Sequence, residues 1–165
     1  MTQHKATYSK IINPVDYIQL MTLQHRYIRE ADEVIARIVG FHTNKKQAQV
    51  VELGCGPVRM TPRLVKPNVV LTAVDHDEGF LQHAAKFIEK RGLSISLVAA
   101  EIQKFRHSQP VDVFVTQGVH HHILKGLSTY IYLRNLAEQL RPNGIYVVSD
   151  EMLPHYDTSD ERLIR

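Results

Sequence analysis

The sequence lacks the features that would tie it to an oxidising compartment or to a membrane. Its 165 residues include a single cysteine, Cys55, so no disulfide can form within the chain. This agrees with a reducing compartment. No apolar run is long enough to span a bilayer, and the N-terminus lacks the apolar segment of a secretory signal. We therefore expect a cytoplasmic protein without a membrane segment.

Long runs of one charge are also missing. The formal net charge is +3, the ten histidines are mostly scattered, and residues 150–161 form an acidic stretch. Without a continuous basic segment, the sequence does not favour a nucleic-acid partner. With 44% hydrophobic and 22% charged residues, the composition is that of a globular chain with one core.

The first part of the chain predicts helices. Asn13 and Pro14 suit a helix N-cap and first turn, and Gly40 suits a helix stop. Whether one helix or two lie between them, with a break near residues 30–32, the pattern leaves open. From residue 50 onwards, short β-branched runs alternate with helical periodicity. The predicted strands are 50–53, 69–74, 95–99, 111–116 and 145–149. The predicted helices are 60–65, 78–91 and 127–140, the last followed by a turn at 141–144.

Strands that alternate with helices predict an α/β fold, a three-layer parallel sheet with strand order 3-2-1-4-5 and an N-terminal helical segment. We divide the chain into an N-terminal helical cap (1–49), a Rossmann-like core (50–150) and a C-terminal tail (151–165). In such sheets ligands bind beyond the carboxyl ends of the strands, where the strand order reverses.

The most informative segment runs from Glu52 to Pro57, where an apolar strand ends in two glycines spaced by one residue. Gly54 and Gly56 allow a sharp turn and a close approach of a ligand to the backbone. The alternative is a tight turn without a ligand. Asp75 follows the second strand, where a carboxylate can accept hydrogen bonds from ribose hydroxyls. Its alternatives are a solvated loop acid or a helix N-cap, a role that Asp77 suits better.

Five segments in chain order resemble the motifs of the Rossmann-like (class I) S-adenosylmethionine-dependent methyltransferases, a resemblance that covers residues 50–150. The segments are 52–57, 73–76, 100–102, 113–123 and 140–145. The resemblance implies S-adenosylmethionine as cofactor and a set of residues that bind it. These residues are Glu52, Gly54, Cys55, Gly56, Pro57, Asp75, His76, Glu101, Ile102, Thr116, Gln117 and Gly118.

Each group in this set has an implied role. The glycine loop would lie against the methionine part of the cofactor, Asp75 would hold the ribose, and His76 would flank the adenine. Glu101 and its neighbour would meet the adenine edge, while the segment after the fourth strand, which begins at Thr116, would lie beneath the sulfonium.

The sequence departs from the family pattern in three places. Val58 stands where many members have a third glycine, and Glu101 replaces a more usual aspartate. Only fifteen residues follow Asp150, too few for the sixth and seventh strands of the family fold. We therefore expect a truncated sheet, in a chain that is part of a longer protein, and a fifth strand whose open edge invites a homodimer.

The run from His120 to His122 admits three interpretations. Adjacent side chains splay apart, so they cannot easily share one metal ion, and we predict no metal site. A scaffold role at the loop-to-helix junction is the plainest reading. The third is that one histidine, His121, is a general base for the acceptor. Cys55 is interpreted as a small residue chosen for fit in the loop, and Tyr8 as part of a lid.

The function predicted from these features is methyl transfer from S-adenosylmethionine to a small-molecule acceptor. One alternative is a methyltransferase-like binding or interaction module without catalysis. The other is an NAD(P)-dependent oxidoreductase, whose fingerprint would place a third glycine where this chain has Arg59.

Overall fold

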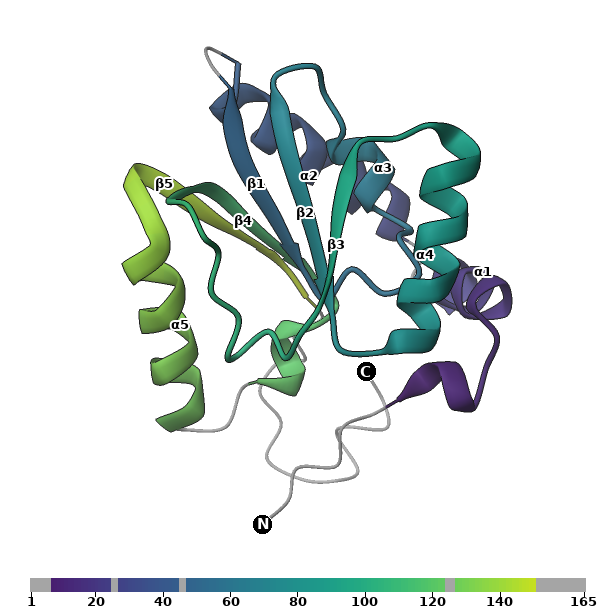
Figure 1. The fold of residues 1–165 in the computed structure, drawn as a ribbon. Helices are drawn as coiled ribbons and strands as arrows, with labels where there is room; N and C mark the ends of the chain where they lie inside the picture. Colours follow the sequence, from purple (N-terminus) through teal and green to yellow (C-terminus); the bar gives the residue numbers. More distant parts are fainter. Residues whose placement is uncertain (1–6, 25–26, 45–46, 124–126, 151–165) are drawn as a thin grey trace.

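The computed structural model describes residues 7–24, 27–44, 47–123 and 127–150, whose ribbon is coloured along the chain in Figure 1. The strands are β1 (Ala48–Leu53), β2 (Val69–Asp75), β3 (Ile95–Ala99), β4 (Val111–Gln117) and β5 (Leu140–Ser149). The α-helices are α1 (Pro14–Gln24), α2 (Ile28–His42), α3 (Thr61–Leu64), α4 (Glu78–Arg91) and α5 (Leu127–Gln139). Two short 3-10 helices are η1 (Tyr8–Lys10) and η2 (His120–His122).

The five strands form one parallel sheet in the order β3-β2-β1-β4-β5, which confirms the predicted fold class and strand order. The order reverses between β1 and β4. Strands β2 and β3 extend the sheet on one side of β1, whereas β4 and β5 extend it on the other side. All carboxyl ends therefore meet at one edge of the sheet, and the loops that follow β1 and β4 lie side by side there.

Helices cover both faces of the sheet and make three layers (Figure 1). Val51 and Leu53 of β1 pack in one apolar cluster with α5, whereas Val50 packs on the opposite face with α2 and α3. Ala73 of β2 contacts α4 on the same face as α2. Both faces of the central strands are thus buried, which explains their almost continuous runs of apolar residues.

The N-terminal helical segment consists of two helices. Asn13 caps α1 as predicted, since its side-chain oxygen accepts hydrogen bonds from the backbone N–H groups of Val15 and Asp16 at 3.1 and 3.0 Å. Helix α1 ends at Gln24, and α2 begins at Ile28 with Tyr27 at its N-cap position. The prediction that Gly40 ends a helix was wrong, because α2 continues to His42. The ammonium group of Lys66 lies next to Gly40, in the space that a Cβ atom of a larger residue would occupy.

Helix α4 has a capping residue at each end. The Asp77 carboxylate accepts hydrogen bonds from the backbone N–H groups of Gly79 and Phe80, and Gly92 ends the helix in the left-handed region at φ 60°. Asp77 also accepts hydrogen bonds from the backbone and hydroxyl of Ser9. Burial opposes ionisation, but these hydrogen bonds hold the pKa of Asp77 below its usual range. The cap of α4 therefore also anchors η1.

Strand β5 begins earlier than predicted. Residues 141–144, expected to form a turn, lie within β5 as an irregularity: Val111 is opposite Leu140, and Val113 is opposite Ile145. Asn143 adopts φ 65° in this bulge, a conformation that asparagine tolerates better than most residues. In the described part of the chain no helix is long and apolar enough to cross a membrane. The predicted tail, residues 151–165, lies outside the described residues.

The position of Gly40 leads to a prediction about stability. Gly40→Ala adds a methyl group inside α2, and only the mobile end of Lys66 has to move aside. Because alanine favours a helix over glycine, the free energy of unfolding should rise by about 0.5–1 kcal/mol. Gly92→Ala is the matched control, and it should lower the same quantity by about 1 kcal/mol because its φ is positive. Urea denaturation of both variants checks the two signs, and destabilisation by Gly40→Ala would contradict the account of α2.

Candidate cofactor site

The loop after β1 is hydrogen-bonded to the neighbouring strand β2. The backbone N–H groups of Gly54 and Cys55 donate hydrogen bonds to the carbonyl of Val74 at 2.7 and 3.0 Å. Gly54 has φ 75°, and a Cβ atom at this position would lie 2.5 Å from a methyl carbon of Val119. Gly54 is therefore required both by the backbone conformation and by the close approach of the β4 loop.

The position that often holds a third glycine in the family is strained here. Val58 is buried and has φ 60°. A β-branched side chain in the left-handed region is a genuine outlier, which costs about 1–3 kcal/mol and persists only where surrounding contacts enforce it. Val58 packs with Cys55 and Leu81, so the apolar core holds the loop in this conformation.

Asp75 connects the glycine loop to the end of β2. One carboxylate oxygen accepts a hydrogen bond from the Gly56 N–H at 2.8 Å, and the other accepts one from the Asp77 N–H at 2.8 Å. His76 lies beside it, with its Nδ1 atom 3.5 Å from the carboxylate. Each carboxylate oxygen has a second lone pair, so the group can still accept hydrogen bonds from a ligand.

Glu52 lies in a buried polar cluster below this loop. Burial raises the pKa of Glu52 from its ordinary value of 4.5 to about 8, although Thr61 and the Arg59 guanidinium oppose the change. Arg59 donates hydrogen bonds to Asp32 of α2 and to Gln117 of β4. Among the described residues, four side-chain atoms are buried without a hydrogen-bond partner: Asp32 Oδ1, Glu52 Oε2, Thr61 Oγ1 and Gln117 Nε2. A buried acceptor and a buried donor are therefore available at neighbouring strand ends.

The sequence pattern did not identify Asp32 and Arg59 as members of this cluster. Asp32 is spaced for the buried face of α2, between Ile28 and the core residues Ile35 and Val39. A buried charged residue on an apolar helix face requires a partner, so the position of Asp32 alone indicates a buried polar contact. Nothing in the sequence pointed to Arg59 as that partner.

The segment after β3 returns to Asp75, as the resemblance implies. The backbone N–H of Ala100 donates a hydrogen bond to the carbonyl of Asp75 at 2.8 Å. Glu101 and Ile102 are half-buried beside it, and the Glu101 carboxylate pairs with Lys104 at 3.1 Å. The predicted adenine-edge residues thus adjoin the predicted ribose-binding residue.

The loop after β4 holds a second polar cluster. The buried Thr116 hydroxyl lies 2.9 Å from the Tyr146 hydroxyl, which is also within hydrogen-bond distance of Tyr132 and of His120. Burial raises the pKa of the Tyr146 phenol above its ordinary value, although the hydrogen bonds with Thr116 and Tyr132 oppose this. Gly118, at φ 63°, donates its N–H to the carbonyl of Ser149 at 2.8 Å. This links the loop to the end of β5.

Aromatic rings from distant parts of the chain gather near these loops. The ring of Tyr17 lies 4.8 Å from that of Phe80 and 5.8 Å from that of Tyr8, while Tyr8 lies 6.5 Å from His122. The contact between Tyr8 and His122 brings η1 against η2 at the carboxyl edge of the sheet, the position a lid would take. The lid itself remains a prediction. Tyr27, in contrast, is 68% exposed.

Cys55, one of the predicted site residues, has little chemical reactivity of its own. Cys55 is buried, and burial raises the pKa of its thiol well above the ordinary value, which disfavours a thiolate nucleophile. Within the described ranges, no group of three or more His, Cys, Asp or Glu side chains is placed to hold a metal ion.

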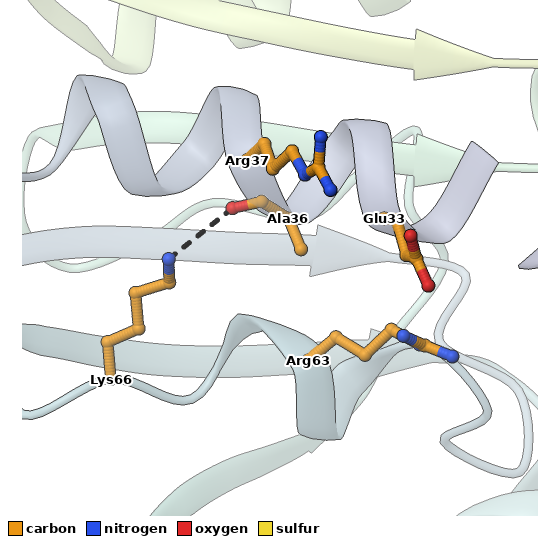
Figure 2. A pocket seen from close by; sticks show the side chains of 5 residues that line it. All are labelled: Glu33, Ala36, Arg37, Arg63 and Lys66. Atoms are coloured by element: carbon orange, nitrogen blue, oxygen red, sulfur yellow. Dashed lines mark hydrogen bonds between the residues drawn. The ribbon is translucent and has the colours of Figure 1, made fainter. Parts of the chain in front are cut away.

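A separate surface hollow of about 470 Å³ lies between α2 and α3 (Figure 2). Its lining residues are Glu33, Ala36, Arg37, Arg63 and Lys66. Lys66 reaches the carbonyl of Ala36 across this hollow, at 3.4 Å. None of the predicted site residues lines it, so it is distinct from the loops at the carboxyl edge.

The profile of the family described as "Methyltransferase domain" matches residues 50–144, which include both strand-end loops. The chain belongs to this family, the class I S-adenosylmethionine-dependent methyltransferases. The cofactor of the family is S-adenosylmethionine. Membership excludes the NAD(P)-dependent oxidoreductase that the sequence left open.

Individual relatives are distant. The chain is similar to a ubiquinone biosynthesis O-methyltransferase of Rickettsia prowazekii, with 24% identity over 116 residues, 70% of this chain and 45% of the relative. It is also similar to a trans-aconitate 2-methyltransferase of Azoarcus sp., with 27% identity over 140 residues, 83% of this chain and 50% of the relative. The chain therefore spans about half the length of these curated relatives.

Solved structures share the fold. The N-methyltransferase NodS from Bradyrhizobium japonicum WM9, in complex with S-adenosylhomocysteine, matches with a TM-score of 0.63 and 23% identity. The match covers 73% of this chain and 60% of NodS.

The residues of this chain fit the cofactor. Two glycines with positive φ keep side chains away from the loop backbone, and Asp75 retains free lone pairs. The cofactor's methionine part carries an ammonium and a carboxylate, for which the Glu52 oxygen and the Gln117 amide nitrogen would be the partners if the cofactor binds here. Glu52, Gln117 and the glycine loop would hold the methionine part, and Asp75 would hold the ribose.

The raised pKa of Glu52 predicts a pH-dependent stability. Between pH 4.5 and about 8 the folded chain retains a proton that the unfolded chain has released. The free energy of unfolding should fall in this range, by at most about 1.4 kcal/mol per pH unit. Glu52→Gln removes this titration, so the variant should gain stability relative to the parent chain as the pH rises. Denaturation at several pH values checks this, with the exposed Glu138→Gln as control, and parallel curves for Glu52→Gln and the parent would contradict it.

Proposed function

We propose that this chain binds S-adenosylmethionine at the carboxyl edge of β1, β2 and β4 and transfers its methyl group to a small-molecule acceptor. The observation that carries the proposal is the hydrogen bond from Gly56 to Asp75, which couples the glycine loop to the ribose-binding residue. Family membership supports the reaction type. The printed names of the relatives include an O-methyltransferase and an N-methyltransferase, so they support no single acceptor atom.

The proposed chemistry requires mainly positioning. When bound, the cofactor supplies a methyl group on a positively charged sulfur, which is reactive without further activation. Holding an acceptor in line with that methyl group can lower the barrier by about 7–11 kcal/mol through proximity alone. The loop that begins at Thr116 would lie beneath the sulfonium, and Tyr8 would close over the acceptor. We propose His121, on η2 beside this loop, as the catalytic residue.

Cofactor binding is tested at Asp75. Asp75→Asn keeps the size of the side chain but removes its charge and one acceptor oxygen, so two ribose hydrogen bonds weaken. Affinity for S-adenosylhomocysteine should fall about 10- to 100-fold, since a hydrogen bond to a charged group contributes about 1.5–3 kcal/mol. Isothermal titration calorimetry measures the change, with Glu138→Gln on α5 as the control. An affinity equal to that of the parent chain would refute the assignment of Asp75.

We also propose that the open edge of β5 pairs with a second copy of the chain. Within the described residues β5 pairs only with β4, and Val148 is 39% exposed on it. Helix α2, which packs on β5 through Ile35 and Val39, adds an exposed apolar stripe. The stripe consists of Val34, Ile38 and Phe41.

The dimer is tested by placing a charge at the edge. Val148→Lys should shift the chain from dimer to monomer in sedimentation equilibrium, because a lysine on an edge strand opposes pairing. Tyr130→Lys is the control, since Tyr130 is exposed on α5 in the layer opposite α2. A parent chain that sediments as a monomer at every concentration would exclude the dimer.

A further inference from the structure

His121 and Asp150, far apart in the sequence, form a hydrogen-bonded pair in the structure. The Nδ1 atom of His121 lies 2.7 Å from one carboxylate oxygen of Asp150, and the His121 backbone N–H donates to the other at 2.8 Å. Both oxygens of one carboxylate thus hold a single residue, by its ring and by its backbone. This arrangement restricts the orientation of the imidazole, as the acid does in histidine-based catalytic sites.

The pairing also determines which ring nitrogen is available. A carboxylate only accepts hydrogen bonds, so Nδ1 of His121 must carry the hydrogen between the two groups. In the neutral ring, Nε2 then has a free lone pair and can accept a proton. The Asp150 side chain is 4% exposed, whereas that of His121 is 44% exposed, so a ligand can reach the ring while its partner stays buried.

The location of the pair connects it with the proposed site. Asp150 directly follows β5, and His121 lies in η2 after β4, at the carboxyl edge of the sheet. The His121 ring lies 3.9 Å from that of His122, which in turn approaches Tyr8. A planar acceptor ring could stack against these aromatic side chains. The neighbouring His120 differs, because its Nδ1 faces the Tyr146 hydroxyl instead of a carboxylate.

We propose, on the basis of the methyl-transfer function proposed above, that the acceptor is a phenol and that Asp150 positions His121 to take its proton. In this step the phenolic oxygen bonds to the methyl carbon, and the carbon–sulfur bond breaks with its electron pair left on sulfur. The phenolic proton moves to Nε2 of His121. The products are a methyl ether, neutral S-adenosylhomocysteine and an imidazolium, which Asp150 stabilises until its proton passes to water.

Other acceptor classes fit the pair less well. A carboxylate is already ionised at neutral pH and gains nothing from a base, and a neutral amine can attack before it loses a proton. An alkyl hydroxyl is about as weak an acid as water, so its pKa lies far above that of histidine and a histidine base deprotonates it poorly. A phenol, with a pKa of about 10, is close enough for general-base catalysis, which typically contributes a factor of about 10²–10⁴.

The test uses the 165-residue chain and matched ring acceptors: catechol, aniline and benzoate. Calorimetry with S-adenosylhomocysteine first establishes cofactor binding in the parent chain and in His121→Ala, His121→Gln, Asp150→Asn and the control His83→Gln, a histidine of α4. Transfer of labelled methyl from S-adenosylmethionine is then measured with each acceptor. Nitrogen NMR of the imidazole reports which ring nitrogen of His121 carries the hydrogen, without any acceptor present.

We expect methyl ether formation from catechol, with a kcat lower by about 10²-fold or more in His121→Gln and by at least about tenfold in Asp150→Asn. KM and cofactor affinity should change little. Added imidazole should restore part of the rate of His121→Ala, and Asp150→Asn should lose the single Nδ1–H form of the ring. A merely structural role of His121 would give no imidazole rescue, and a merely structural role of Asp150 would leave the tautomer of His121 unchanged.

The remaining outcomes separate this inference from the function on which it rests. If the parent chain binds S-adenosylhomocysteine but methylates only aniline or benzoate, or none of the three, the phenol assignment is overturned and cofactor binding still stands. A catechol rate unchanged in His121→Gln overturns the role of the pair. Absence of cofactor binding in the parent chain overturns the proposed function and this inference together.

Discussion

The carboxylate of Asp75 is the point at which the site is held together. Its two oxygens accept backbone hydrogen bonds from different turns, one after β1 and one before α4. The second turn places Asp77 as the cap of α4, and Asp77 in turn binds Ser9 and so anchors η1. A single carboxylate therefore sets the glycine loop, the start of α4 and the N-terminal segment that carries Tyr8. Charge-assisted hydrogen bonds of this kind are about twice as strong as neutral ones.

The second organising element is the buried polar cluster around Arg59. Its guanidinium joins Asp32 of α2 to Gln117 of β4, while Glu52 lies beside it without a full set of partners. Buried polar groups are costly unless they are hydrogen-bonded, and in the proposed function the cofactor would supply the missing partners. The strained backbone of Val58 lies in the same loop. Strain and unmet polar groups thus coincide at the position where the family binds its cofactor.

The sequence was sufficient for the architecture and for much of the site. Hydrophobic runs and glycine-bearing turns predicted all five strands and their order, because parallel strands buried on both faces have distinct patterns. The helix end predicted at Gly40 was wrong. A glycine is found there because Lys66, from a distant segment of the chain, occupies the space of a Cβ atom. The bulge at residues 141–144 and the pairing of His121 with Asp150 also depend on how β4 and β5 are aligned. Local pattern cannot supply such an alignment.

The central position of β1 has a consequence for the order of assembly. β1 pairs with β2, which soon follows it in the chain, and with β4, which comes long after. Closing the longer connection is entropically slower, so the half built from β1, β2 and β3 should form before β4 is added. Until β4 arrives, one edge of β1 stays open to water and Glu52 can remain ionised. The docking of β4 should then be accompanied by proton uptake, which makes the final step of sheet assembly visible to a pH indicator.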